Sequence, residues 1–597
     1  MCSSCRSNFV VASRRFSSEP AVPAPPPPAA ADKPYYVTTP IFYVNAAPHI
    51  GHMYSMVLAD VFKRWQTLLG NRAILCTGTD EHGMKVQQAA ALADMDPKQF
   101  CDENAEKFEE LAHLSRVDYD RFIRTTDSDH VQAVEHFWFL LREKGLIYET
   151  KHEGWYSVSD ECFYPESQLV KYQESFTGAV YMASAETKNK VEWVEEKNYC
   201  FRMTELKDRL LDFYEKNPGW IEPAFRMNEV VDWVKNHLED LSISRPVQRL
   251  SWGIRAPGDP SQTIYVWVDA LINYLTAAGF PDWAPGESHL GGWPADVHIV
   301  GKDILRFHCV YWPALLMALD LPLPKKVLVH SHWTLNKRKM SKSLGNVVNP
   351  IYAINRWGVD TARFYLLSEG GIADDADYSN NTLVVKYKKY LQWGFGNLLG
   401  RLTRPKVWNV REVVKNSFTE DASRPQVPKA LQELITGFEA ALAELPPTVA
   451  QQMEKHDPVS AIRKILEIGT RLNEFLTQTQ PWSLVKSSNP ADRVAAENVL
   501  FLVAEGLRIS GILLQPFLPD KATQMLDTLG VAQDKRTFGH TVLRCDPDYG
   551  VPMVDPGSSR VDGLFPPLVE DVEVTYSGSV KTRRKATSTF PIVQTDN

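Results

Sequence analysis

The sequence predicts two kinds of structure in succession, an α/β fold built on a parallel sheet and then an all-α region. Between about residues 35 and 144, short apolar segments rich in β-branched and aromatic residues alternate with helical patterns. Short aromatic and polar strands interrupt this alternation at about 145–223, and it resumes over 224–376. Only helical periodicity remains over 377–545. We therefore expect a Rossmann-like nucleotide-binding domain with an inserted connective domain, followed by a helical bundle.

Composition limits the classes of protein that the chain can belong to. At 597 residues it is too long for one hydrophobic core, and 44% hydrophobic with 23% charged residues is typical of globular proteins. No apolar run reaches the ~20 residues that a bilayer-spanning helix needs, so we expect no membrane association. The net charge is −8, so any RNA binding must use local basic patches. The eight cysteines form no disulfide framework, which suits a reducing compartment.

The two ends of the chain are expected to lie outside the folded domains. Residues 1–34 begin with a stretch that is basic, rich in serine and free of acids up to Glu19, and they continue as a proline-rich linker. The first part has the composition of a mitochondrial presequence, and an unstructured N-terminus is the alternative. Residues 546–597 form a Ser/Thr-rich tail that we expect to be mobile, with its basic run solvated rather than bound to RNA.

The first strand, from Tyr36 to Pro40, leads through a loop into a helix that begins near Gly51. His49 and His52 lie at this junction, on either side of Gly51. The N-terminus of a helix presents backbone N–H groups to phosphate, and imidazoles can donate hydrogen bonds to a polyphosphate. By itself this pattern also fits surface histidines on a capped helix.

A second motif occurs about 290 residues later and contains Lys339, Ser341, Lys342 and Ser343. Alone it also fits a solvated basic loop. Together the two motifs resemble the "HIGH" and "KMSKS" signatures of the class I aminoacyl-tRNA synthetases, both without a mismatch. The resemblance implies that the two motifs bracket ATP, with His49, Gly51 and His52 at the triphosphate and the lysines at the leaving pyrophosphate. Mg²⁺ is expected to accompany ATP, bound mainly by phosphates and water.

The remaining elements are expected in chain order. A second strand covers 73–78 and leads to Asp80, and later strands lead to further candidate site residues. The other expected elements are helices at 98–114 and 127–144, a strand at 263–270 with a helix through Tyr274, a strand at 297–303, and a helix at 304–319.

From residue 35 to 543 the chain resembles the methionyl-tRNA synthetases in particular. The resemblance implies that Asp80 receives the ammonium of the amino acid and that Arg245 is a charged partner near its carboxylate. The other pocket residues that it implies are Ile41, Tyr43, Trp267, Ala270, Tyr274, His308 and Trp312. A cluster of aromatic and imidazole rings suits a flexible thioether side chain. For any single aromatic in this set, ordinary core packing is the alternative.

In the helical region, Asn397, Arg401 and Trp482 resemble the anticodon readers of the same family. Asn397 and Arg401 are four residues apart, so one helix face carries both. Trp482 follows a proline that starts a helix and can offer a stacking face, although core packing is again the alternative.

Two absences are expected. The methionine branch often carries a Cys-rich zinc knuckle in its insert, but the matching segment here keeps only Cys162. One thiolate cannot build a tetrahedral site, so we expect no protein-bound zinc. No additional C-terminal RNA-binding domain is recognisable, so we expect a monomer.

The resemblance therefore implies an enzyme of the mitochondrial matrix that activates methionine with ATP and transfers it to tRNA(Met). Leucyl-, isoleucyl- or valyl-type ligases are one alternative, but they usually carry a much larger editing insert than the ~80 residues expected here. A non-catalytic tRNA-binding relative is another, and the intact His49, His52, Lys339 and Lys342 argue against it.

Overall fold

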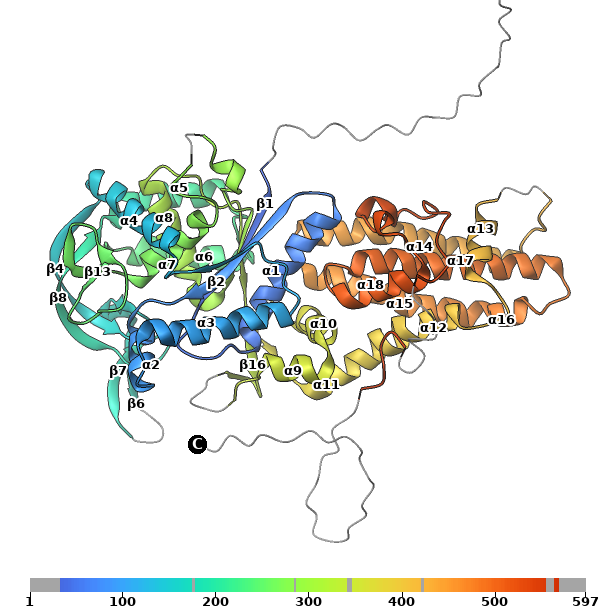
Figure 1. The fold of residues 1–597 in the computed structure, drawn as a ribbon, viewed down its shortest axis with the longest axis horizontal. Coiled ribbons are helices and arrows are strands. Elements are labelled where there is room, and N and C mark those ends of the chain that lie inside the picture. Colours follow the sequence, from blue (N-terminus) through green and yellow to red (C-terminus); the bar gives the residue numbers. More distant parts are fainter. Residues whose placement is uncertain are drawn as a thin grey trace, which may run out of the picture. The chain divides into compact units, whose positions relative to one another are not determined.

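The computed structural model describes residues 33–173, 178–283, 286–340, 346–419, 423–553 and 563–568 (Figure 1). The chain forms two compact units. The first contains residues up to 48, 55–113 and 117–331, and the second contains 49–54, 114–116 and the residues from 332 onward. Most of the expected presequence and C-terminal tail lies outside the described residues, as do Ser341, Lys342 and Ser343.

The first unit is built on a parallel sheet of six strands in the order β3-β2-β1-β14-β15-β9. The strands are β1 (Tyr35–Tyr43), β2 (Ala73–Asp80), β3 (Arg121–Arg124), β9 (Ile221–Glu222), β14 (Val297–Gly301) and β15 (Val327–His330). β1 and β14 are the central pair, and β2 lies on the other side of β1. This arrangement confirms the predicted Rossmann-like α/β fold.

Helices connect these strands, as crossovers between parallel strands require. They are α1 (Ile50–Leu68), α2 (Met84–Leu92), α3 (Pro97–Leu114), α4 (Ser128–Glu143), α5 (Lys207–Lys216), α6 (Ala224–His237), α7 (Val266–Thr276) and α8 (Trp312–Ala318). Asp127 precedes α4 at the predicted cap position, but its carboxylate accepts from the backbone N–H of Arg124 and from the Arg121 side chain instead of capping the helix.

The insert forms an antiparallel sheet in the order β10-β8-β4-β5. Its strands are β4 (Ile147–Ser157), β5 (Cys162–Tyr164), β8 (Glu192–Phe201) and β10 (Leu241–Ser242), and a separate hairpin contains β6 (Leu169–Gln173) and β7 (Val180–Ser184). The sheet topology does not agree with the expected end of the insert at residue 223. β9 already belongs to the parallel sheet before residue 223, and β10 still belongs to the antiparallel sheet after it.

Two of the predicted elements are wrong in detail. The strand expected at 263–270 ends at Ile264 as β13 (Asp259–Ile264), in an antiparallel sheet with β11 (Ser244–Pro246) and β12 (Arg255–Ala256). The residues after it form α7, which is buried on all sides and so has no polar face to reveal its helical period. The single helix expected at 304–319 is a 3₁₀ turn (Lys302–Ile304), a π-helical turn (Phe307–Tyr311) and α8.

The second unit begins with a small sheet of β16 (Trp333–Leu335), β17 (Arg338–Lys339) and β18 (Ala376–Asp377), and is helical beyond it. Its helices are α9 (Pro350–Trp357), α10 (Val359–Glu369), α11 (Asn380–Lys386), a π-helix (Tyr387–Gly396), α12 (Asn397–Thr403), α13 (Val410–Ser417), α14 (Lys429–Glu454), α15 (Pro458–Thr479), α16 (Pro481–Leu484), α17 (Pro490–Leu514) and α18 (Pro519–Leu529). The C-terminal part of α17, from Val499 to Leu514, is buried on every side and belongs to the core of the bundle. The predicted all-α region is confirmed.

Candidate active site

The carboxyl end of β2 places Asp80 in the interior of the first unit, with 2% of its surface exposed. Among the described residues, its Oδ1 has no hydrogen-bond partner. Burial raises the pKa of Asp80 well above its usual range, and the neighbouring carboxylates of Asp269 and Glu161 raise it further. A buried carboxylate in this condition favours a cationic partner, because a positive charge would restore its ionised form.

Two more unsatisfied polar atoms lie near Asp80. Tyr43 is its register partner on β1, and Trp267 meets the Tyr43 ring edge-on at 6.3 Å between centroids. Within the described part of the chain, neither the Tyr43 hydroxyl nor the Trp267 Nε1 has a hydrogen-bond partner, and both are buried. Unpaired buried groups are costly and rare, so three of them in one place indicate a site for a ligand with both donors and acceptors.

The Trp267 ring is held in a stack. Phe307 lies parallel to it, with 3.6 Å between ring centroids and 5° between planes. Phe307 is not among the expected pocket residues, and it lies at the start of the π-helical turn. Ile41 on β1 packs against the same core, and Ala270 follows Trp267 on α7, where the Asn273 side chain binds its carbonyl.

Tyr274 and His308 belong to the same aromatic cluster, and the His308 ring lies edge-on to Trp267. The Nδ1 of His308 lies 3.0 Å from the carbonyl of Ile304 and must donate to it, so Nε2 accepts from the Tyr274 hydroxyl at 2.7 Å. Burial lowers the pKa of His308 from 6.5 to about 4. The imidazole is therefore neutral near pH 7, in a tautomer fixed by two hydrogen bonds.

A second neutral histidine supports the first. The Trp312 Nε1 donates to Nε2 of His298 at 3.3 Å, so Nδ1 of His298 donates to the Thr38 hydroxyl at 2.7 Å. Burial lowers the pKa of His298 well below its usual value. The Tyr274 ring lies 4.3 Å from His298 and 6.0 Å from Trp312, so the expected residues Tyr274, His308 and Trp312 belong to one packed cluster.

Behind the cluster, Asp269 fixes the position of α7. Its two carboxylate oxygens bind His82 Nδ1 at 2.7 Å and His130 Nε2 at 2.9 Å. Burial alone would raise the pKa of Asp269, but the two histidines outweigh it and hold the pKa below its usual range. The sequence did not reveal this network, because its members are far apart in the chain and no local pattern joins them.

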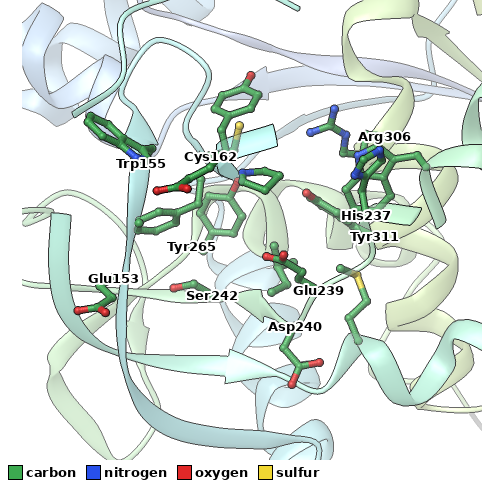
Figure 2. Close-up of a pocket in the computed structure, with 18 of the residues that line it drawn as sticks. Glu153, Trp155, Cys162, His237, Glu239, Asp240, Ser242, Tyr265, Arg306 and Tyr311 are labelled. Atoms are coloured by element: carbon green, nitrogen blue, oxygen red, sulfur yellow. The ribbon is translucent and has the colours of Figure 1, made fainter. Parts of the chain in front are cut away.

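Arg245 lies in a different environment from the one expected for it. It is 1% exposed, its Nη1 donates to the carbonyl of Ser244 at 2.7 Å, and its guanidinium lies 4.7 Å from the ring centroid of Tyr265. It lines a cavity of about 280 Å³ at the insert, where Figure 2 shows Trp155 and Cys162 on one side and Arg306 and His237 on the other.

Cys162 lies on β5 in the wall of this cavity. Burial raises the pKa of its thiol to about 12, so it is protonated near neutral pH and is a poor metal ligand in that form. In the described parts of the chain, no three His, Cys, Asp or Glu side chains are grouped as metal ligands.

In the second unit, His49 and His52 lie together at the start of α1. Their rings stack with 3.8 Å between centroids. Each Nδ1 accepts from a backbone N–H, that of Gly51 for His49 and that of His49 for His52, so a neutral ring carries its hydrogen on Nε2. A Cβ on Gly51 would lie 2.9 Å from the His49 ring, so the glycine is needed for this stack.

The hairpin that precedes the second motif lies in the same unit. Lys339 is exposed on β17, and the hairpin turn at Asn336 and Lys337 has φ values of 55° and 58°. Tyr54, in the first turns of α1, meets Trp333 of β16 edge-on at 6.1 Å, and the N–H of Ile50 donates to the carbonyl of Val348 at 3.1 Å. The segments on both sides of residues 341–345 therefore lie beside the start of α1.

The three expected RNA-reading residues lie on two helices of the second unit. Asn397 is exposed on α12, and the Arg401 guanidinium lies 5.2 Å from the ring centroid of Trp482 on α16. The Trp482 side chain is 37% exposed. An indole that is partly exposed and covered on one side by a guanidinium can present its other face to a base.

Comparison with known proteins agrees with this geometry. Residues 35–403 match the family described as tRNA synthetases class I (M), and residues 423–543 match the anticodon binding domain of methionyl tRNA ligase. The chain is 60% identical to a probable mitochondrial methionine–tRNA ligase of Neurospora crassa over 96% of its own length and 91% of the relative's. It is 44% identical to the Schizosaccharomyces pombe protein of the same name, over 85% of this chain and 92% of that protein.

A solved structure gives the same result. The Mycobacterium tuberculosis methionyl-tRNA synthetase bound by methionyl-adenylate is 38% identical, with a TM-score of 0.79 over 89% of this chain and 100% of that chain. The parallel sheet, the helical C-terminal region and both family matches lead to one conclusion. The chain belongs to the methionyl-tRNA synthetases, the class I ligases that activate methionine with ATP and transfer it to tRNA.

Proposed function

We propose that the chain charges tRNA(Met) with methionine in the mitochondrial matrix, with the amino acid held by the cluster around Asp80. The three unsatisfied buried atoms of Asp80, Tyr43 and Trp267 carry the proposal. The ammonium of methionine would pair with the Asp80 carboxylate. Its thioether chain would lie among Ile41, Trp267, Ala270, Tyr274, His308 and Trp312, where sulfur contacts with aromatic rings are favourable.

Activation requires the methionine carboxylate to attack the α-phosphorus of ATP. His49 and His52 would donate from Nε2 to the triphosphate, with the N–H groups at the start of α1 beside them. Lys339, Ser341, Lys342 and Ser343 would hold the leaving pyrophosphate, with Mg²⁺ bound to the phosphate oxygens. Arg245 is proposed to act near the methionine carboxylate, which requires it to turn from the aromatic rings that now surround it.

The role of the second motif can be tested by substitution. If Lys342 meets pyrophosphate only in the transition state, Lys342→Ala should lower kcat in ATP–pyrophosphate exchange and leave methionine binding nearly intact. Equal losses of binding and turnover would show that the residue acts in ground-state binding or in folding.

At the other end of the molecule, Asn397, Arg401 and Trp482 are proposed to read the anticodon. The contact between Arg401 and Trp482 supports this role, because it joins two of the three residues in one exposed feature. Import into mitochondria rests on the basic, acid-free N-terminal stretch and on the mitochondrial names of the relatives. Fractionation of mitochondria should recover the protein with soluble matrix markers, and recovery in the cytosol alone would contradict the location.

We further propose that the enzyme is a monomer without bound zinc. The protonated Cys162 thiol supports the second point. Elemental analysis of the purified protein should find less than one zinc per chain, and activity should survive a chelator once Mg²⁺ is restored. Sedimentation should give a single species near 67.6 kDa before removal of any presequence.

A further inference from the structure

One segment of the second unit is strongly basic although the chain as a whole is acidic. Residues 378–411 contain seven lysines and arginines and no Asp or Glu, whereas the net charge of the chain is −8. Most of this segment is the continuous run of α11, the π-helix and α12, which is yellow in Figure 1. A local excess of positive charge on an acidic protein is the electrostatic mark of a nucleic-acid contact.

The exposed side chains of this run follow one another at intervals of four residues. Lys389, Trp393 and Asn397 are exposed, and Arg401 follows them in partial exposure. The π-helical turns between 387 and 396 are wider than those of an α-helix, so residues four apart stay near one face. The buried residues of the run, which include Tyr387, Leu391, Phe395, Leu398 and Leu402, point into the bundle instead.

Trp393 is the most unusual member of this face, because 60% of its side chain is exposed. Its backbone is well fixed: the Asn473 side chain donates to the carbonyl of Gly394 at 3.2 Å, and Phe395 is completely buried. A large aromatic ring on a rigid, exposed helix face is a stacking surface already in position. A single exposed hydrophobic residue is common and by itself needs no explanation. Trp393 is different because it shares its face of the helix with Lys389 and with Arg401, which contacts Trp482.

We propose that Lys389 and Trp393 extend the face formed by Asn397, Arg401 and Trp482 into a continuous track for single-stranded RNA. Trp393 would stack on a base of the anticodon loop next to the bases read at Trp482, and Lys389 would contact a backbone phosphate. Trp393 and Arg401 are eight residues apart, roughly 12 Å at the α-helical rise, so the track is long enough for more than one nucleotide. This inference rests on the proposed anticodon role of Asn397, Arg401 and Trp482.

Full-length Trp393→Ala and Trp393→Phe proteins test the proposal, with Phe139→Ala as the control. Phe139 is also an exposed aromatic, 50% exposed, but it lies on α4 of the first unit. With a complete tRNA(Met) transcript, Trp393→Ala should lower kcat/KM for charging by about 5- to 150-fold, chiefly through KM. Trp393→Phe, which keeps a stacking ring, should stay within about fivefold of the wild type, and Phe139→Ala should charge normally.

Charge provides a second readout. Lys389→Ala should weaken binding of an anticodon stem-loop RNA and reduce the slope of log Kd against log salt by about 0.7, the value for one phosphate contact on a single strand. An unchanged slope would overturn the role of Lys389.

A Trp482→Ala protein separates this inference from the proposed function. If Trp482→Ala impairs charging and Trp393→Ala does not, the extended track is wrong and the anticodon role stands. If neither impairs charging, the anticodon role itself is wrong and the track with it. If Trp393→Ala lowers the Tm substantially, the ring packs against another part of this chain, and the RNA assignment is overturned.

Discussion

The amino-acid cluster of the first unit and the RNA face of the second both depend on tryptophan, in opposite environments. Trp267 is 8% exposed and stacked on Phe307, whereas Trp482 is 37% exposed and contacts Arg401. The enclosed ring contributes to folding and to binding at once, because it belongs to the hydrophobic core of the first unit. The exposed ring contributes mainly to binding. The two sites should therefore respond differently to the same substitution, and this difference can be measured.

The largest effect is expected at Asp80, a buried carboxylate whose Oδ1 has no hydrogen-bond partner among the described residues. Asp80→Asn should lower kcat/KM for methionine in ATP–pyrophosphate exchange by about 10²- to 10⁴-fold, because a buried charge that loses its partner costs about 3–5 kcal/mol. The KM for ATP should hardly change.

The folded Asp80→Asn protein should be at least as stable as the wild type, since the substitution removes a buried carboxylate whose pKa is already raised. Loss of stability together with unchanged methionine kinetics would show that Asp80 is a structural residue.

Trp267→Ala should affect both properties of the enclosed site. Loss of the ring leaves a cavity against Phe307 and should lower the free energy of unfolding by about 3–5 kcal/mol, with a parallel loss of methionine activation. Trp267→Phe, which keeps an aromatic stack, should lose less of each. Denaturant unfolding measures the loss of stability, and ATP–pyrophosphate exchange on the same preparation measures the loss of methionine activation. A Trp267→Ala protein with unchanged stability and unchanged exchange would refute the proposed packing role.

Trp482→Ala tests the exposed site in the same way. Stacking is worth about 1–3 kcal/mol per base, so kcat/KM for tRNA should fall roughly 5- to 150-fold. Methionine-dependent exchange, in which no tRNA takes part, is expected to proceed at nearly the wild-type rate, with little change in Tm. A large drop in Tm, with exchange and charging reduced together, would mean that Trp482 packs instead of reading RNA.

The pH dependence of stability tests the enclosed site, to which His308 belongs. The pKa of His308 is about 4 in the folded protein and 6.5 as a free side chain, so the unfolded state binds the proton first as the pH falls. His308 therefore contributes stability that is complete above pH 6.5 and is lost on acidification toward pH 4. Acidification from pH 7 to pH 5 should therefore lower the free energy of unfolding by about 2 kcal/mol through His308. His308→Gln should remove that part of the pH dependence, and an unchanged slope would contradict the assigned tautomer and burial.

Local patterns predicted much of the fold. Apolar runs of β-branched residues identified β1, β2 and β14, and helical periodicity identified the bundle. The pattern predicts a strand over 266–270, the first residues of α7, because every residue of this helix is buried and the polar face that reveals a helix is missing. Short apolar runs of this kind remain ambiguous until their partners are known.

The site was predictable to a smaller extent, because much of it depends on contacts between distant residues. The sequence motifs placed Tyr274 and His308 in one pocket, and the structure joins them by a hydrogen bond. The same motifs did not indicate that Phe307 stacks on Trp267 or that Asp269 links His82 to His130. Nor did the resemblance, which implies a role for Arg245 near the substrate carboxylate, indicate that its guanidinium lies 4.7 Å from the ring centroid of Tyr265. Such partners are set by tertiary packing, which local periodicity does not encode.

The most direct test of the account is ATP–pyrophosphate exchange measured separately with each of the twenty standard amino acids and with homocysteine. Methionine alone among the twenty should support strong exchange, since the aromatic cluster around Trp267 and Tyr274 suits a linear thioether and excludes branched side chains. Homocysteine lacks one methyl group, worth about 1–3 kcal/mol in an apolar pocket, so it should be activated measurably but more weakly. Exchange that is stronger with leucine, isoleucine or valine than with methionine would contradict the account.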